Sequence, residues 1–315
     1  IVNLQQLRYV HEVVKCGLNI TEAAAALFTS QPGISKQIRL LEEELGVDIF
    51  VRQGRRLIGV TEPGQQILSI TEGLLRDIGN LRQVGQEFSN ADSGSLTIAT
   101  THTQARYALP PVVRQFMARY PKVRLELHQG NPSQISDWEL AGQADIAIAT
   151  EAIDQHSELA MLPCQQWNRV VIAPPGHPIF EEKPLTLEAI ARYPVVTYDS
   201  TFSGRSQINK AFAARNLTPN VVLTAIDADI IKTYVALGLG VGIVAAMAYD
   251  EQADRELRAV DAAHLFESSM TRIGIRRNAW LREYAYVFIG LFAPHLNRKL
   301  VEAALCGESA DDPGL

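Results

Sequence analysis

The sequence predicts an α/β protein whose N-terminal part is a small helical domain followed by one long helix. Three short helical patterns lie within residues 1–60, a pattern with a seven-residue repeat follows, and strand patterns alternate with helical patterns from Ser95 onward. Alternating strands and helices are typical of α/β architecture. A chain of 315 residues that is 47% hydrophobic can bury more than one core, so we expect domains at 1–60, 61–90 and 91–315.

The stretch from residue 19 to residue 56 predicts two helices that meet at a tight turn. Asn19 and Glu22 have the spacing of a reciprocal cap, and Ser30 is placed to cap the second helix, with Pro32 in its first turn. Apolar residues spaced by three or four predict one buried stripe on the second helix, made of Ile34, Ile38, Leu41 and Leu45. A similar stripe predicts an earlier helix packed on these two, with Leu4, Leu7, Val10 and Val14.

The opposite face of the second helix gathers hydrogen-bond donors and cations near its N-terminus. These residues are Gln31, Pro32, Ser35, Lys36 and Arg39. Lys and Arg bind phosphates or guanine, and Gln binds adenine, so this face suits the major groove of DNA. Arg52, Arg55 and Arg56 follow around Gly54 and predict a wing beside the helix. The alternative is an ordinary helical hairpin with a solvated polar face.

These residues resemble the winged helix-turn-helix of the LysR-type transcriptional regulators. The matching motifs are N-I-T-E-A-A, S-Q-P-G-I-S-K-Q-I-R-L-L-E-E-E-L-G, I-F-V-R and V-T-E-P-G, from about Leu4 to Gly64. Pro63 stands where the family commonly has Ala, and Gly54 adds flexibility to the wing. Together, the pattern and the resemblance predict eight DNA-contacting residues: Ser30, Gln31, Pro32, Ser35, Lys36, Arg39, Arg52 and Arg55.

The charge of the chain favours binding to DNA in more than one copy. Residues 1–60 hold seven basic and six acidic residues and so have a net charge of +1. The whole chain has a net charge of −6, so the remaining residues have a net charge of −7. Affinity for DNA depends on the local basic surface rather than on the total charge. Because this surface is only weakly basic, one copy should bind weakly, and we expect a homodimer or homotetramer.

The long helix from Thr61 to about Ser89 is the expected dimerisation element. Ile67, Leu74, Leu81 and Phe88 are seven residues apart, a spacing typical of two helices wound together. Dimerisation would place two recognition helices on the half-sites of one duplex, and the LysR family uses this segment in that way. The alternative is a single helix packed on its own domain. The segment Asn90–Gly94 is expected to be a hinge.

The remainder is expected to form two α/β lobes with a cleft between them, the shape of periplasmic binding proteins. The first lobe would comprise residues about 91–163 and 268–315, and the second about 164–267. The expected strands are Leu96–Thr100, Val123–His128, Asp145–Ala149, Val170–Ala173, Val195–Thr197, Val221–Ala225, Val241–Ala245 and Thr271–Ile275.

Hydroxyl groups follow several of the expected strands. The first strand ends in residues 100–104, T-T-H-T-Q, the third ends at Thr150, and T-F-S-G-R opens a helix at residues 201–205. Ligands of open α/β sheets bind beyond the carboxyl ends of the strands, near helix N-termini. These ends predict a site for a small anion. The alternative is that each Thr or Ser is only a helix cap.

A second resemblance covers nearly the whole chain. The chain resembles the CysB branch of the LysR family, the cysteine-regulon activators, in the motifs I-A-T-T-H-T-Q-A-R-Y-A-L-P, A-I-A-T-E-A, M-L-P-C-x-x-W-N-R, F-S-G-R-S and A-x-D-A-D-x-I-K-T-Y-V-x-L-G-L-G-V-G. In that branch the cleft holds sulfate or an acetylserine inducer. The resemblance implies six effector-binding residues: Thr101, Thr103, Gln104, Thr150, Trp167 and Ser203. Ser203 replaces a common Thr, and Asp199 would repel an anion if it faced the cleft.

Other functional classes lack support in the sequence. The glycines at 238, 240 and 242 lead from helix to strand, the wrong order for a dinucleotide loop, so we expect no cofactor. His102 has no nucleophile or paired carboxylate in a defined relation to it, so we expect no catalytic residue and no enzyme. Three distant cysteines give no metal-binding pattern. Asp227, Asp229 and Lys232 could form a charged cluster, but a capped helix start with a pair spaced by three residues explains them equally well.

The expected location is the cytoplasm, without membrane contact. The N-terminal residues I-V-N-L-Q-Q-L-R-Y-V lack the pattern of a signal peptide, and no apolar run reaches the length of a membrane span. The sequence therefore predicts a regulator of cysteine-biosynthesis genes that binds promoter DNA and is controlled by sulfate, O-acetylserine or N-acetylserine. Activation through RNA polymerase is implied by the family. The alternative effector is an unrelated small carboxylate.

Overall fold

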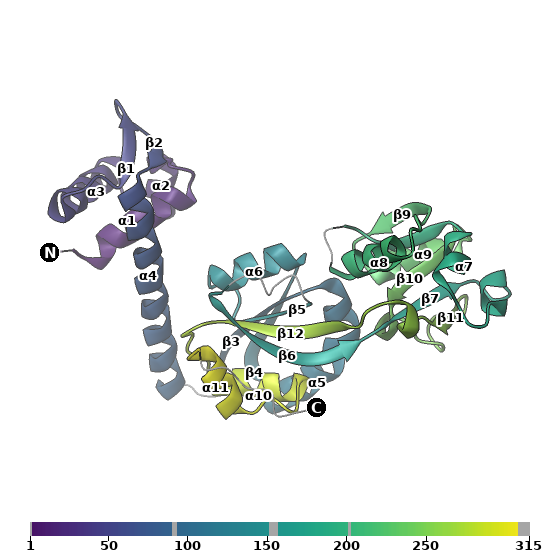
Figure 1. Ribbon diagram of the computed structural model, residues 1–315. Helices are drawn as coiled ribbons and strands as arrows, with labels where there is room; N and C mark the ends of the chain where they lie inside the picture. Colours follow the sequence, from purple (N-terminus) through teal and green to yellow (C-terminus); the bar gives the residue numbers. More distant parts are fainter. Residues whose placement is uncertain (1, 90–92, 151–156, 201–202, 308–315) are drawn as a thin grey trace. The chain divides into compact units, whose positions relative to one another are not determined.

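The computed structural model describes residues 2–89, 93–150, 157–200 and 203–307, without the side chains of residues 83, 86–89 and 203. The chain divides into two compact units, Ile1–Gln86 and Glu87–Leu315, whose elements are labelled in Figure 1. Among the described residues, no helix is both long enough and apolar enough to cross a membrane.

The first unit begins with three short helices that share one core. They are α1 (Leu4–Lys15), α2 (Ile20–Ala26) and α3 (Gln31–Leu45). The expected caps are present, because Asn19 accepts hydrogen bonds from the N–H groups at the start of α2 and Ser30 accepts one from Gly33. Ile34, Ile38 and Leu41 are at most 1% exposed and form the centre of the core.

Two expected core positions lie outside this core. Leu4 is 51% exposed and Leu45 is 40% exposed, because each is the terminal residue of its helix and reaches past the packed helices. Val13 is buried where Val14 was expected, and Val14 is half-buried. Helical spacing of three or four residues allows either neighbour to complete the stripe, and packing decides between them.

The wing is a two-stranded antiparallel hairpin of β1 (Phe50–Gln53) and β2 (Arg56–Val60), joined at Gly54 with a φ of +62°. The buried carboxylate of Glu42 on α3 holds it in place. Glu42 accepts hydrogen bonds from the N–H groups of Ile49 at 2.8 Å and Phe50 at 3.2 Å, and pairs with Arg52 at 2.6 Å. This carboxylate fixes the wing beside α3.

The long helix α4 (Glu62–Ser89) starts as expected, since the Thr61 hydroxyl accepts a hydrogen bond from the N–H of Gly64 at 3.0 Å. Part of its apolar surface is uncovered in the first unit. Ile70, Leu74 and Leu81 are 66%, 44% and 70% exposed. Phe88, the last member of the expected repeat, has a side chain outside the described part.

The first lobe of the second unit is built on a five-stranded sheet in the order β4-β3-β5-β12-β6. Its strands are β3 (Ser93–Thr100), β4 (Lys122–Gln129), β5 (Ile146–Ala149), β6 (Leu159–Trp167) and β12 (Ser269–Arg276). Its helices are the π-helical turn η1 (Gln104–Ala108), α5 (Leu109–Arg119), α6 (Pro132–Leu140), α10 (Glu283–Phe292) and α11 (Arg298–Leu305). Residues of α5, α10 and α11 share one hydrophobic core with the sheet, and α6 packs in a smaller one.

The second lobe has a five-stranded sheet in the order β11-β7-β10-β8-β9. Its strands are β7 (Arg169–Ala173), β8 (Val195–Tyr198), β9 (Val221–Ala225), β10 (Val241–Ala245) and β11 (Arg258–Asp261). Its helices are α7 (Leu187–Ala191), α8 (Ser203–Ala214) and α9 (Ala228–Ala236), with 3-10 turns η3 (Pro178–Glu181), η4 (Ala246–Ala248) and η5 (Ala263–Leu265). Residues of α7 and α8 belong to one core and residues of α9 to another.

All eight expected strands of the α/β part are present within three residues at either end. Strand β6 was missed because Pro163 interrupts its pattern, and Pro is tolerated here since β6 lies at the edge of its sheet. This strand continues to Trp167 in the first sheet, past the lobe boundary expected at 163–164. Ser93 and Gly94, expected in a hinge, belong to β3, and residues 90–92 lie outside the described part.

A buried carboxyl group in the first lobe makes stability depend on pH. Glu139 on α6 is 1% exposed, and one of its oxygens accepts a hydrogen bond from the N–H of Arg276 at 3.0 Å. Burial raises the pKa of Glu139 to about 8 from 4.5. A raised carboxyl pKa stabilises the fold fully below pH 4.5, and this contribution is lost as the pH rises towards 8.

We expect Glu139→Gln to remove this pH dependence, because glutamine keeps the acceptor for Arg276 and carries no titrating proton. Thermal unfolding of the wild type and the variant from pH 5 to pH 9 measures it. The melting temperature of the variant should rise relative to the wild type as the pH increases. Glu158→Gln, at an exposed position of the same unit, is the control. Parallel profiles for wild type and Glu139→Gln would contradict the assignment.

Candidate DNA-binding surface and effector pocket

The start of α3 and the wing enclose one groove of about 510 Å³. Seven of the eight residues predicted to contact DNA line it: Gln31, Pro32, Ser35, Lys36, Arg39, Arg52 and Arg55. The fold therefore brings the predicted donors and cations together. The eighth, Ser30, caps the helix instead, since its hydroxyl accepts a hydrogen bond from the N–H of Gly33 at 3.3 Å.

Arg52 and Arg55 have different surroundings in this groove. Arg52 is 26% exposed and paired with the buried Glu42, so much of its hydrogen-bonding capacity is used within the domain. Arg55 is exposed next to the turn of the wing. Of these two arginines, Arg55 is therefore the more available to a phosphate.

A second, small pocket lies where the two lobes meet, with a volume of about 40 Å³. It is lined by Thr101, Thr103, Gln104, Thr150, Trp167, Tyr198 and Gly204. Five of the six predicted effector-binding residues are among them. Ser203, the sixth, opens α8 directly before Gly204, and its side chain is outside the described part. Thr201 and Phe202 also lie outside it.

The lining residues come from the ends of four strands and the starts of two helices, as the strand-end rule predicts. Thr101 follows β3, Thr150 follows β5, Trp167 ends β6 and Tyr198 ends β8. Gln104, 2% exposed, donates to the Thr271 hydroxyl at 3.0 Å, which fixes its amide.

The chemistry of the pocket suits a small acceptor-rich ligand. Its wall offers threonine hydroxyls, an amide and an indole. The indole Nε1 of Trp167 is buried and has no hydrogen-bond partner among the described residues. Since buried donors are almost always paired, this N–H is available to an acceptor outside the described residues, such as a ligand oxygen. Sites for drug-sized ligands measure about 300–1,000 Å³, so the space of about 40 Å³ favours a much smaller ligand.

Tyr198 is a pocket residue that the sequence analysis missed. It is buried, its hydroxyl accepts a hydrogen bond from the N–H of Ala245 at 3.2 Å, and it is also hydrogen-bonded to Thr103. Burial raises the pKa of the Tyr198 hydroxyl. Its position at the carboxyl end of the V-V-T-Y strand could have marked Tyr198 as a pocket residue. An aromatic residue at that position is equally typical of the hydrophobic core.

Asp199 does not line the pocket, so its carboxylate is not part of the wall, where it would repel a bound anion. Its backbone N–H donates to the carbonyl oxygen of Ala225 at 2.9 Å. Burial lowers the pKa of Arg205, and the negative charge of Asp199 opposes this shift. Asp199 therefore interacts electrostatically with the Arg205 guanidinium.

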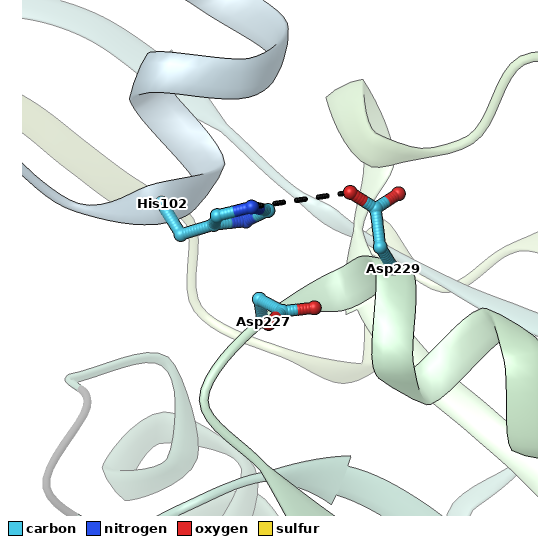
Figure 2. A group of neighbouring side chains, drawn as sticks. All are labelled: His102, Asp227 and Asp229. Carbon is cyan, nitrogen blue, oxygen red and sulfur yellow. Dashed lines mark ion pairs between the residues drawn. The ribbon is translucent and has the colours of Figure 1, made fainter. Parts of the chain in front are cut away.

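A charged cluster bridges the two lobes beside the pocket. We call it the interlobe cluster; it comprises His102, Arg106, Tyr107, Asp227, Asp229 and Lys232. Figure 2 shows His102 and Asp229 facing each other, with Nε2 and Oδ2 3.9 Å apart, and Asp227 beside them. Asp229 also accepts a hydrogen bond from the Tyr107 hydroxyl at 2.7 Å and lies 3.4 Å from Arg106.

The interlobe cluster has some features of a metal site, because ligand atoms of His102, Asp227 and Asp229 lie within 4.8 Å of one another. Its electrostatics do not fit a cation. Burial raises the pKa of Asp229, but the Tyr107 hydroxyl, Lys232 and Arg106 outweigh it, so the pKa is lowered. Asp227 caps α9 by accepting from the N–H of Ile230 at 2.8 Å. The carboxylates are thus already neutralised or hydrogen-bonded by the protein.

A helix-turn-helix with a wing, joined to a two-lobed α/β fold with a pocket between the lobes, is the architecture of a ligand-responsive transcription regulator. Residues 4–65 match the bacterial regulatory helix-turn-helix proteins of the LysR family, and residues 89–297 match the LysR substrate binding domain. The chain belongs to the LysR family, and its relatives place it in the CysB branch.

Two relatives from Burkholderia cenocepacia are similar over almost their whole length. The chain is 55% identical over 306 residues to the HTH-type transcriptional regulator SsuR, covering 97% of this chain and 98% of that protein. It is 52% identical over 308 residues to the HTH-type transcriptional regulator CysB, covering 98% of each.

Solved structures agree with the fold. The crystal structure of the cofactor-binding domain of the Cbl transcriptional regulator matches with 43% identity and a TM-score of 0.65, covering 68% of this chain and 93% of that one. Full-length CbnR in complex with its target DNA matches with a TM-score of 0.58, covering 92% and 99%, and its 19% identity supports the fold alone.

Tyr107→Phe tests the bond that crosses between the lobes. Burial raises the pKa of Tyr107 to about 12, so its hydroxyl stays protonated and donates to Asp229 at every physiological pH. Its loss should lower the free energy of unfolding by about 1 kcal/mol, the usual contribution of a partly exposed hydrogen bond. Urea denaturation measures the change.

Tyr249→Phe is the matched control, since the Tyr249 hydroxyl lies 3.5 Å from the carbonyl oxygen of Leu257 within the second lobe. It should change the free energy of unfolding less than Tyr107→Phe does. An equal or larger effect at Tyr249 would mean that the interlobe bond has no special contribution.

Proposed function

We propose that the protein regulates genes of sulfur assimilation and cysteine biosynthesis in the cytoplasm, under the control of a small sulfur-related anion or an acetylserine. The observation that carries this proposal, for the small anion in particular, is the pocket of about 40 Å³ with hydroxyl, amide and indole donors. The unpaired N–H of Trp167 supports an acceptor-rich ligand. The similarity to regulators named CysB and Cbl supports the sulfur signal.

The first unit would read promoter DNA as a dimer. The side chains that line the groove at the start of α3 would contact bases in the major groove, and the exposed Arg55 of the wing would contact the DNA backbone. Exposed apolar side chains along α4, at Ile70, Leu74 and Leu81, support pairing with a second copy. Two dimers would form a tetramer, and contact with RNA polymerase would follow from the family.

Effector binding would act through the position of the lobes. Thr101 and Thr103 line the pocket, and His102 between them approaches Asp229 of the opposite lobe. A ligand held by residues of both lobes shifts the equilibrium towards the arrangement that it binds better. The interlobe cluster is placed to stabilise one such arrangement, so occupancy of the pocket would change the spacing or bending of bound DNA.

Isothermal titration of the full chain with sulfate, O-acetylserine and N-acetylserine tests the pocket. At least one of them should bind the wild type. Thr103→Ala should weaken that binding about tenfold, or about 1.4 kcal/mol, because it removes a hydroxyl from the wall and from Tyr198. Thr218→Ala, an exposed threonine in the second lobe, is the control and should bind as the wild type does.

Two other outcomes would change the conclusion. If none of the three ligands binds while another small carboxylate does, the protein is a LysR-type regulator with an unrelated effector. If Thr103→Ala binds as tightly as the wild type, the effector site lies elsewhere.

The DNA-binding proposal is tested on a duplex selected by the full chain from random sequences. Lys36→Ala should weaken binding to all DNA sequences. It should also reduce the slope of the logarithm of the binding constant against the logarithm of the salt concentration by about 1, as the loss of one phosphate contact does. Gln31→Ala should relax base preference at one position by about 1–3 kcal/mol. Fluorescence anisotropy at several salt concentrations measures both.

Lys15→Ala, at the exposed end of α1, controls for a general loss of positive charge. It should leave affinity and salt dependence nearly unchanged. Wild-type behaviour of both the Lys36 and the Gln31 variants would exclude α3 as the reading helix.

A further inference from the structure

Arg169 is a fully buried cation beside the effector pocket. It begins β7, is 0% exposed, and belongs to the largest fully buried side chains of the protein. Burying a charge costs several kcal/mol unless hydrogen bonds compensate. Here the guanidinium donates to the carbonyl oxygen of Glu267 at 3.0 Å and to the Ser269 hydroxyl at 2.9 Å. These bonds hold the cation in one orientation.

The guanidinium reaches three of the seven residues that form the pocket wall. Its central carbon lies 5.0 Å from the centre of the Trp167 ring, and one nitrogen donates to the carbonyl oxygen of Gly204 at 3.4 Å. Its charge also acts on the third, Tyr198, where it lowers the hydroxyl pKa against the larger effect of burial. Arg169 therefore lies directly behind the wall, on the side of the second lobe.

The described residues of the wall carry no formal charge, since they are three threonines, a glutamine, a tryptophan, a tyrosine and a glycine. Neutral donors bind any ligand oxygen of suitable geometry and respond weakly to the ligand's total charge. A fixed cation in a poorly solvated region attracts each additional negative charge more strongly. Arginine is suited to this role, because it stays protonated even when buried.

We propose that Arg169 sets the charge preference of the effector pocket, making it favour a dianion over a monoanion of the same shape. This inference rests on the proposed function, because it concerns the ligand of the same pocket. Arg169 acts through Trp167 and the first turn of α8 and is thus a specificity-determining residue that does not itself touch the ligand.

Sulfate and methanesulfonate provide the test, because both are tetrahedral and methanesulfonate carries one negative charge less, with a methyl group in place of one oxygen. Their dissociation constants are measured by calorimetry at constant ionic strength with the full chain. The wild type should bind sulfate at least tenfold more tightly than methanesulfonate. Arg169→Gln should bring this ratio close to one, mainly by weakening sulfate. Arg169→Lys should keep most of the ratio, even if both affinities fall.

Lys210→Gln is the matched control. It removes a cation from α8 in the same lobe, at a position that is 66% exposed and pairs with Glu267. The ratio should stay at the wild-type value, because solvent screens an exposed charge. A merely structural role of Arg169 would weaken both anions equally in Arg169→Gln and leave the ratio unchanged, which overturns the proposal.

The wild-type ratio tests the inference even if Arg169→Gln fails to fold. Equal binding of the two anions by the wild type would refute a charge preference without any variant. If the wild type binds sulfate and methanesulfonate equally tightly, the inference about Arg169 fails, but the proposed function stands because the pocket still binds sulfate. No binding of sulfate, methanesulfonate or either acetylserine would remove the proposed function and the inference with it.

Discussion

The antiparallel pairing of β6 with β12 is the constraint on which the second unit depends. The two strands pair from Ser269 opposite Trp167 to Arg276 opposite Leu159 (Figure 1). β6 leads into the second lobe and β12 returns from it, so their pairing fixes where the lobes meet. One end of this pair supplies Trp167 to the pocket, while Ser269 and Thr271 hold Arg169 and Gln104.

Local patterns sufficed for much of the fold and for most of the pocket. The strands at 221–225 and 241–245 have the expected bounds, because apolar runs between turn residues leave few alternatives. The pocket was predicted from hydroxyl residues that follow strand ends, because ligands of open α/β sheets bind beyond the carboxyl ends of the strands. Trp167 was added by the resemblance to the CysB branch. The exposed polar face at the start of α3 was predictable because helical spacing separates it from the buried stripe.

The features that were missed depend on contacts distant in sequence. An arginine at the start of a strand is ordinarily expected to be exposed. Arg169 is buried because its guanidinium donates hydrogen bonds to Glu267 and Ser269, about 100 residues later in the chain. Pro163 hid β6, because only the sheet order shows that this strand lies at an edge. Leu45 followed the helical repeat, yet the helix extends beyond its core. In each case the pattern was correct locally and the tertiary neighbours decided the outcome.

The π-helical turn η1 connects the pocket with the contacts between the lobes. Gln104, at its start, lines the pocket, and Tyr107, three residues later, reaches Asp229 and packs against the core of the second lobe. Single π-helical turns are frequently found at functional sites. Because the two residues share one turn, the same short element lines the pocket and carries a hydrogen bond between the lobes.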